Sequence, residues 1–376
     1  MMSDHPFYNG DADVKAVIAK RTGDWERSLS TYGRLKVVRT VGILNDTNVD
    51  DGHFGCIRVM NCIRDNLGSR ELEVAVAVPS GVDWRSKETY KDALSNVDLI
   101  LINGEGTLHH GRRKGRWLLE VATSEHLDGI PKAVVNAVWQ DNPGDWAELL
   151  AKFDLVATRD SRSASLAKSA TGRDVRWMPD FSLYAKVERK NLARNGIVIG
   201  DSASGATSSE LGKLGSDLQS AGHDVTLVPV VTSDHGQQNK TGWKALRLKL
   251  RLWRIAAAQK NLSKTNFVAN VDEYLACLQS ASVNINGRFH SICLSLATYT
   301  PFIAFSSNSW KIEALIEDVG LDQERLVSRG AFGSKEFAAR DWSFSQQELA
   351  NIDAFLAKAR SDISALFDDV SSMAGK

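Results

Sequence analysis

The sequence predicts an α/β protein with two Rossmann-like domains that face a central cleft. The chain has 376 residues, more than a typical single domain, which favours a two-domain organisation. From residue 36 onward, short apolar segments alternate with amphipathic segments, and the apolar segments are nearly continuous. Strands covered by helices on both faces have this pattern, so each domain should contain a parallel, doubly wound sheet.

The first Rossmann-like domain is expected over residues 36–190, on the acceptor side of the cleft as argued below. It follows an N-terminal helical extension, residues 1–35, in which we identify no chemistry. Its expected strands are residues 37–44, 72–78, 97–102, 133–138 and 154–158, and its expected helices are residues 55–67, 87–95, 116–127, 145–152 and 160–169.

The second domain is expected over residues 191–340, because a polar, charged segment at 184–195 precedes a new apolar segment. Its expected strands are residues 197–199, 225–230, 267–269, 282–285 and 302–305, and its expected helices are residues 208–220, 241–258, 272–279, 290–299 and 309–318. The remaining segment, 341–376, contains a long helix at about 345–367 with apolar residues at helical spacing. We expect this helix to pack across both domains.

Charge and composition limit the possible partners. Lysine plus arginine (46) equals aspartate plus glutamate (46), so the overall charge gives no indication of nucleic-acid binding. The first ten residues do not resemble a signal peptide, and no apolar run approaches the roughly 18 residues of a membrane span. The four cysteines (Cys56, Cys62, Cys277 and Cys293) lack Cys-x-x-Cys spacing. We therefore expect a cytoplasmic protein with no metal site and no cofactor.

The stretch Asn286-Gly287-Arg288-Phe289-His290 stands between an apolar segment and a helix-like segment. This arrangement places Arg288 and His290 at the carboxyl edge of a sheet, where open α/β sheets bind ligands. A lone arginine or histidine is often only structural, but the next strand end is also polar. Residues 306–309 read Ser-Ser-Asn-Ser and precede a helix carrying Lys311, so hydroxyls, backbone N–H groups and a cation meet there. Together the two strand ends predict an anion-binding site.

A long polar loop follows the first expected strand, at residues 45–56. It contains Asn45, Asp46 and His53, and it has glycines at 52 and 55. Loops between strand and helix are usually 2–6 residues long, so this length favours a binding loop. The alternative is an Asx-rich helix cap with two glycine turns.

A second polar loop follows the third expected strand and begins Asn103-Gly104-Glu105-Gly106. Two glycines flanking an acid let the backbone approach a ligand, and Glu105 could act as a base or bind sugar hydroxyls. A plain turn with a solvated glutamate is the alternative. The neighbouring His109 and His110 do not face the same way, which disfavours a metal shared between them.

Three basic features remain. Arg159 stands at a strand end and could hold a phosphate or carboxylate. Asp160 or Ser161, which follow it, would cap the next helix. The run at 112–116, Arg-Arg-Lys-Gly-Arg, could attract an acidic substrate or form a solvated face. The helix expected at 241–258 carries an aromatic and basic stripe from Trp243 to Arg254, which suits a membrane surface or a lipid-linked acceptor. An ordinary amphipathic helix explains the same stripe.

At these positions the sequence resembles the polysaccharide pyruvyl transferase family. The resemblance runs in order from residue 41 to about 320 and includes Asn286-Gly287-Arg288-Phe289-His290, Pro301-Phe302-Ile303-Ala304, Lys311, Arg159-Asp160-Ser161, Pro179-Asp180 and a glycine-rich turn after Val97-Asp98-Leu99-Ile100. Family members use two Rossmann-type domains in the GT-B arrangement of many glycosyltransferases. They transfer the enolpyruvyl group of phosphoenolpyruvate to a sugar as a cyclic ketal. The resemblance thus implies a transferase that acts on a bacterial surface polysaccharide and releases phosphate.

The resemblance also implies residue roles, with Arg288 as a phosphoenolpyruvate ligand and His290 as the essential histidine. We expect a catalytic set of His290, Arg288 and Glu105. The expected phosphoenolpyruvate ligands are Arg159, Asn286, Arg288, Ser307 and Lys311. The expected acceptor ligands are Asn45, Asp46, His53, Asn103, Glu105 and His109, with a glycan or lipid-linked glycan as the acceptor.

Two departures from the family pattern concern the acceptor side. The family's Asn-x-Gly-Asp reads His53-Phe54-Gly55-Cys56 here, and its triple-glycine turn reads Gly104-Glu105-Gly106. The family's Asn and Asp roles therefore do not transfer to His53 and Cys56. A different acceptor, such as an acidic keto-deoxy sugar, would explain both departures.

Two other function classes fit the same pattern. A GT-B glycosyltransferase would use Arg288 and Lys311 to hold the diphosphate of a nucleotide sugar, and a sugar-binding relative would lack turnover. The sequence leaves open the acceptor sugar, the ketal stereochemistry, the general base, the role of Asp180 and the oligomeric state. Binding of the stripe from Trp243 to Arg254 to lipid would place the protein at the inner face of the membrane.

Overall fold

The computed structural model describes residues 38–48, 52–190, 193–230 and 264–375. Residues 39–376 form one compact unit. The expected N-terminal extension, residues 1–35, lies outside the described residues, and so does the helix expected at 241–258 with its Trp243 to Arg254 stripe. No helix in the described part of the chain is long and apolar enough to cross a membrane.

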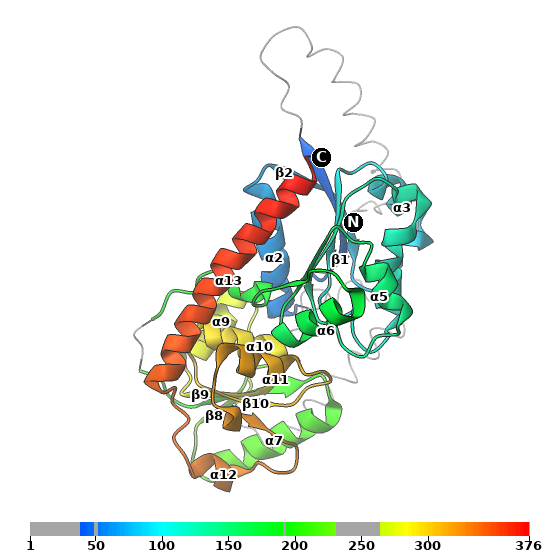
Figure 1. The fold of residues 1–376 in the computed structure, drawn as a ribbon. Coiled ribbons are helices and arrows are strands. Elements are labelled where there is room, and N and C mark those ends of the chain that lie inside the picture. The colour runs from blue at the N-terminus through cyan, green and yellow to red at the C-terminus, as the bar shows by residue number, and fades with distance from the viewer. Residues whose placement is uncertain (1–37, 49–51, 191–192, 231–263, 376) are drawn as a thin grey trace, which may run out of the picture. The chain divides into compact units, whose positions relative to one another are not determined.

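The first half of the chain forms a parallel sheet with strand order β2-β1-β3-β4-β5-β6. Its paired strands β1 and β2 are labelled in Figure 1. Its strands are β1 (Arg39–Asp46), β2 (Leu72–Pro79), β3 (Leu99–Asn103), β4 (Lys132–Ala137), β5 (Leu155–Thr158) and β6 (Arg176–Trp177). Strands β3 and β4 are buried along their whole length, as their continuous apolar sequences predict.

The second half forms another parallel sheet, with strand order β11-β10-β9-β7-β8. Its strands are β7 (Ile197–Ser202), β8 (Val225–Leu227), β9 (Val283–Gly287), β10 (Phe302–Phe305) and β11 (Leu326–Val327). The predicted α/β class is confirmed, since both sheets are parallel and alternate with helices. The domain boundaries given above stay a prediction.

Helices follow most strands of both sheets. They are α2 (Phe54–Gly68), α3 (Glu88–Leu94), α4 (Arg113–Leu119), α5 (Asp145–Leu150), α6 (Ser161–Thr171), α7 (Gly205–Ser220), α9 (Val271–Ser280), α10 (Phe289–Ala297), α11 (Lys311–Val319), α12 (Ser334–Ala338) and α13 (Gln346–Met373). Short 3-10 turns lie at η1 (Trp84–Ser86), η2 (Glu120–Thr123), η3 (Glu125–Leu127), η4 (Phe181–Leu183) and η6 (Gln323–Arg325).

Two predicted elements were wrong. The helix expected at 116–127 instead begins at Arg113 and gives way to η2 and η3, where β-branched Val121 and Thr123 disfavour a continued helix. Residues 267–269 are not a strand, and only an isolated bridge joins nearby Thr265 to β8. Phe267 is 61% exposed, so this segment does not bury an apolar face as a strand would.

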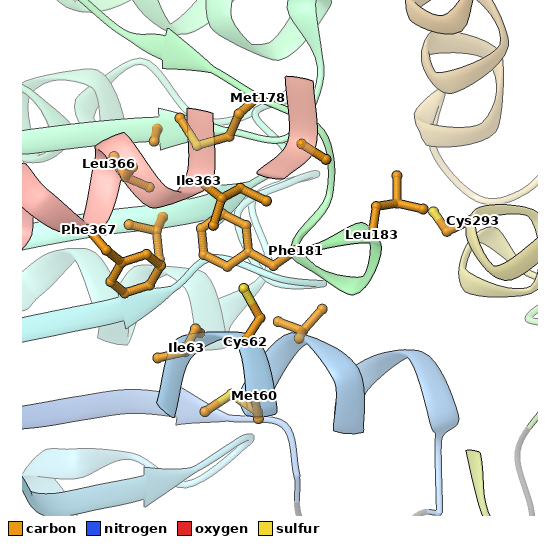
Figure 2. Packing of buried hydrophobic residues seen from close by; sticks show 14 of the residues in the cluster. Met60, Cys62, Ile63, Met178, Phe181, Leu183, Cys293, Ile363, Leu366 and Phe367 are labelled. Atoms are coloured by element: carbon orange, nitrogen blue, oxygen red, sulfur yellow. The ribbon is translucent and has the colours of Figure 1, made fainter. Parts of the chain in front are cut away.

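The core that joins the helices of both halves is built around η4. Phe181 lies between α2 and α13, with its ring 5.8 Å from the ring of Phe367 and close to Cys62 (Figure 2). This cluster also contains residues of α10 and α11. Helix α13 therefore shares one apolar core with helices that follow strands of each sheet.

Arg325 is fully buried beside α13 and is neutralised by Glu348. Its Nε and Nη2 donate to the two carboxylate oxygens at 2.6 and 2.9 Å. Glu348 also accepts from the backbone N–H of Ser345 and so completes the N-terminal cap of α13. Burial raises the pKa of Glu348, but these hydrogen bonds outweigh it and lower the pKa to about 2.

We expect Glu348→Gln to destabilise the fold by about 3–5 kcal/mol at pH 7, because it leaves the Arg325 charge buried without a counter-ion. The folded pKa of Glu348 lies below its unfolded value, so its stabilisation is complete above about pH 4.5 and falls as pH drops toward 2. Urea unfolding at pH 7 and pH 3 should show a smaller gap between wild type and variant at pH 3. Glu324→Gln, at an exposed ion pair with Arg340, is the control and should change stability by less than about 1 kcal/mol.

Candidate active site

His290 lies in the first turn of α10 and is almost fully buried. Its Nε2 is 3.3 Å from Oε1 of Glu105 and 3.6 Å from Oδ1 of Asp180. The edge of its ring meets the His53 ring at a centroid separation of 5.0 Å. Two carboxylates and a second imidazole, all from the first half of the chain, therefore surround one histidine from the second half.

Gly55 makes room for the His290 ring. A Cβ atom added at Gly55 would lie 2.1 Å from Cγ and 2.2 Å from Cβ of His290, closer than any real contact. Only glycine fits this position in the first turn of α2. The close approach of α2 and α10 depends on it.

Arg159 is anchored by Asp180, which also lies near His290. Its Nη1 donates to Oδ2 of Asp180 at 3.0 Å, and its guanidinium lies over the Phe289 ring at 4.2 Å. Asp180 is completely buried, which raises its pKa. The interaction with His290 and the positive charge of Arg159 outweigh burial and hold that pKa far below its usual range. Asp180 is therefore a carboxylate that anchors Arg159 and lies 3.6 Å from His290.

Arg288 is anchored in the same way by Asp201, at the end of β7. Its Nε donates to Oδ2 of Asp201 at 3.0 Å. The buried amide of Asn286 accepts from the backbone N–H of Arg288 at 3.1 Å and fixes the turn between β9 and α10. Asn286 thus positions Arg288 through the backbone.

Lys311 opens α11 near both arginines. Its Nζ donates to the side-chain oxygen of Asn308 at 3.0 Å, and the Ser307 hydroxyl donates to the same oxygen at 3.3 Å. Burial and the charges of Arg159, Arg288 and Arg112 lower the pKa of Lys311 to about 7. In this cation group, defined as Arg159, Arg288 and Lys311, each arginine is paired with an aspartate, and the arginine charges still disfavour the charged form of Lys311.

Glu105 is held by the loop that follows β1 and by the first turn of α2. The Cys56 thiol donates to Oε1 and the Thr47 hydroxyl to Oε2, both at 3.0 Å. Asn45, in the left-handed region with φ 62°, donates from its amide to the carbonyls of Asn103 and Glu105. The two departures from the family pattern, at Cys56 and Glu105, are thus in direct contact.

Several predicted acceptor residues have structural partners. Asp46 forms an ion pair with Arg64 at 2.6 Å. Asn103 is fully buried, and its side-chain oxygen accepts from the Glu105 backbone N–H at 3.2 Å. His109 is buried, and burial together with nearby Arg112 and Lys311 lowers its pKa to about 3, so its ring is neutral at pH 7. These contacts give Asp46 and Asn103 local structural roles, and acceptor binding stays a prediction for all three residues.

The site also contains residues that the sequence did not single out. Asp201 was not predicted at all, and the role of Asp180 was left open, although each anchors an arginine. Both follow apolar segments. The sequence therefore indicated each of them only as an acidic residue at the end of a strand or before a turn. That signal does not say which arginine the acid will meet.

Comparison with known proteins identifies the family. The sequence profile described as polysaccharide pyruvyl transferase matches residues 50–309, which is more than half of the chain. The chain belongs to the polysaccharide pyruvyl transferase family. The match includes His53, Glu105, Arg159, Arg288 and His290, and it makes this protein a member of a transferase family. A search of curated proteins found no significant match.

Solved structures resemble the fold of this pyruvyl transferase family member at low sequence identity. Arabidopsis thaliana UGT89C1, complexed with UDP-L-rhamnose, is 10% identical with a TM-score of 0.50, covering 89% of this chain and 99% of that one. Glycyrrhiza uralensis UGT73P12 is 10% identical with a TM-score of 0.47, covering 90% and 96%. An alpha-glucosyltransferase in complex with UDP and DNA is 11% identical with a TM-score of 0.43, covering 89% and 93%. The first of these confirms the GT-B-like fold and nothing further.

Proposed function

We propose that this protein transfers the enolpyruvyl group of phosphoenolpyruvate to a sugar and forms a pyruvate ketal with release of phosphate. The observation that carries the proposal is the cation group Arg159, Arg288 and Lys311 beside the buried His290. Phosphoenolpyruvate carries a phosphate and a carboxylate, and these three cations would contact the two groups. The family assignment supports the same reaction class.

In this proposal Arg288, Ser307 and Lys311 bind the phosphate, and Arg159 binds the carboxylate. Charge-assisted hydrogen bonds of this kind contribute about 1.5–3 kcal/mol each. Asp201 and Asp180 hold the two guanidinium groups at fixed positions, so less side-chain entropy is lost on binding. Asn286 acts by fixing the turn that carries Arg288.

His290 would protonate the methylene carbon of phosphoenolpyruvate as a sugar hydroxyl attacks the adjacent enol carbon. Glu105 or His53 would accept the hydroxyl proton. A second hydroxyl of the same sugar then attacks that carbon, and the bond between carbon and the phosphate oxygen breaks. The proton of this hydroxyl passes to the departing phosphate as the ketal closes. The 3.3 Å separation of His290 and Glu105 suits an acid and a base acting on one substrate.

The acceptor is proposed to be a glycan or a lipid-linked glycan whose sugar contacts the loops around Asn45–His53 and Asn103–His109. Neutral His109 can donate to and accept from hydroxyls, and nearby Arg112 favours an acidic sugar such as a keto-deoxy acid. The protein is proposed to act in the cytoplasm without a cofactor.

Thermal-shift titration tests the donor assignment. Stabilisation by phosphoenolpyruvate, and not by UDP-sugars, is the expected result. A GT-B glycosyltransferase with the same fold would give the opposite pattern, with UDP-sugars raising the melting temperature and phosphoenolpyruvate having no effect.

Donor binding should take up a proton through Lys311. Its pKa of about 7 means that it is mostly neutral at pH 8, where a phosphate group (second pKa about 6) is already a dianion. Binding the anion favours charged Lys311, so phosphoenolpyruvate should bind with uptake of close to one proton at pH 8, and its affinity should fall as pH rises further. Calorimetry in buffers of different ionisation enthalpy measures this uptake.

Lys311→Arg is the matched variant for this measurement, since arginine stays charged throughout the range. It should bind phosphoenolpyruvate with no proton uptake. An unchanged uptake in Lys311→Arg would show that a different group titrates.

A further inference from the structure

In the described part of the chain, three side chains that can bind a metal ion lie close together: His53, Cys56 and His290. One ligand atom from each lies within 4.8 Å of the others. They come from the start of α2 and the start of α10, so sequence spacing gave no sign of them. The expectation of no metal site rested on cysteine spacing within single segments, which misses a cluster of this kind.

Glu105 places a carboxylate oxygen beside this cluster. Its Oε1 is 3.0 Å from the Cys56 sulfur and 3.3 Å from the His290 Nε2. A tetrahedral zinc ion with bonds of about 2.0–2.3 Å requires ligand atoms about 3.3–3.6 Å apart. The His290–Glu105 separation falls within this range, the Cys56–Glu105 separation is slightly shorter, and the ligand atoms of His53, Cys56 and His290 lie within 4.8 Å of one another.

We propose that His53, Cys56, Glu105 and His290 bind one Zn²⁺ ion, through two imidazole nitrogens, one thiolate sulfur and one carboxylate oxygen. This mixture of nitrogen, sulfur and oxygen donors suits zinc and disfavours magnesium or calcium, which require oxygen ligands. Binding converts the Cys56 thiol to a thiolate and releases its proton to solvent.

Charge balance is compatible with an ion at this place. The divalent ion would be coordinated by one thiolate and one carboxylate, and because only the Cys56 proton is released, the site gains one positive charge on binding, next to the carboxylates of Glu105 and Asp180. Asp180 and Asp201 remain paired with Arg159 and Arg288 and need not move. The ion replaces the hydrogen bond that Cys56 now donates to Glu105.

Zinc binding has a consequence for turnover, which rests on the proposed function. A nitrogen of His290 that coordinates zinc cannot transfer a proton, so zinc should inhibit phosphate release from phosphoenolpyruvate. A chelator should restore it. Inhibition by this route requires Cys56 as well as the histidines.

The binding test uses the full-length protein, stripped by a chelator and titrated with Co²⁺ and Zn²⁺. We expect one Co²⁺ per chain with a near-ultraviolet thiolate-to-cobalt absorption band, which Zn²⁺ displaces. Cys56→Ser should lose the band and bind Zn²⁺ at least about tenfold more weakly, since even residues that only orient a ligand are worth 10–100-fold. Cys277→Ser, at a half-buried cysteine on α9, is the matched control and should keep both.

The proposal is overturned if the protein binds no Co²⁺, or if the band and the affinity survive in Cys56→Ser. These readouts do not depend on turnover, so they test the metal site independently of the pyruvyl transfer reaction. Conversely, a protein that binds zinc at Cys56 but never releases phosphate from phosphoenolpyruvate would support the metal site and contradict the proposed function.

Discussion

Replacing His290 with alanine should lower phosphate release from phosphoenolpyruvate by about 100- to 10,000-fold, the range that a positioned general acid contributes. The imidazole is the group placed between Glu105 and Asp180, within 3.6 Å of both carboxylates. The cation group is on separate residues and should still bind the donor. Steady-state phosphate release and donor affinity, measured on the same preparation, separate the two effects.

His290→Gln separates loss of proton transfer from a folding defect, because glutamine keeps a polar side chain in the buried site but cannot transfer a proton. We expect the same loss of turnover with a melting temperature near that of wild type. His126→Gln, at an exposed histidine of η3, is the control and should leave turnover unchanged. Near-normal turnover in His290→Gln would rule out proton transfer by this residue.

Replacing Gly55 with alanine should destabilise the fold by about 1–3 kcal/mol, the usual range for overpacking. It should also lower turnover by about 100-fold, because displacing a catalytic group by 1 Å can have that effect. The physical reason is the 2.1 Å separation between an added Cβ and the His290 ring. Urea unfolding and phosphate release measure the two consequences.

Gly68→Ala is the matched control on the same helix, since a Cβ added there meets no atom within 4 Å. It should stabilise the protein by about 0.4–1 kcal/mol through reduced flexibility of the unfolded chain, with no effect on turnover. If Gly55→Ala behaved like Gly68→Ala, the close packing of α2 against His290 would be wrong.

Much of the fold could be predicted because apolar strands and amphipathic helices leave local signals. Strands β3 and β4 and helix α10 were placed to within a few residues, since burial on both faces requires continuous apolar sequence. The short strands β6 and β11 were not predicted, because two residues carry no periodicity. Helix α4 was misplaced because its basic first turn resembles a solvated loop.

The candidate site was predictable only in part. Arg288, His290 and Arg159 stand at strand ends, and parallel topology brings such ends to one edge. The pairing of Asp201 with Arg288, and of Cys56 with Glu105, depends on side-chain directions across loops far apart in sequence. The contact between Cys56 and Glu105 suggests that the two departures from the family pattern are one change in the chemistry of the acceptor side.

The most direct measurement uses phosphoenolpyruvate labelled in its pyruvyl carbons, incubated with the protein and a panel of glycan acceptors. We expect label to enter one acceptor as an acid-labile ketal, with one phosphate released per label transferred, and no transfer by His290→Gln. Transfer of a sugar from a UDP-sugar to the same acceptors, without any incorporation of pyruvyl label, would contradict pyruvyl transfer and establish a glycosyltransferase instead.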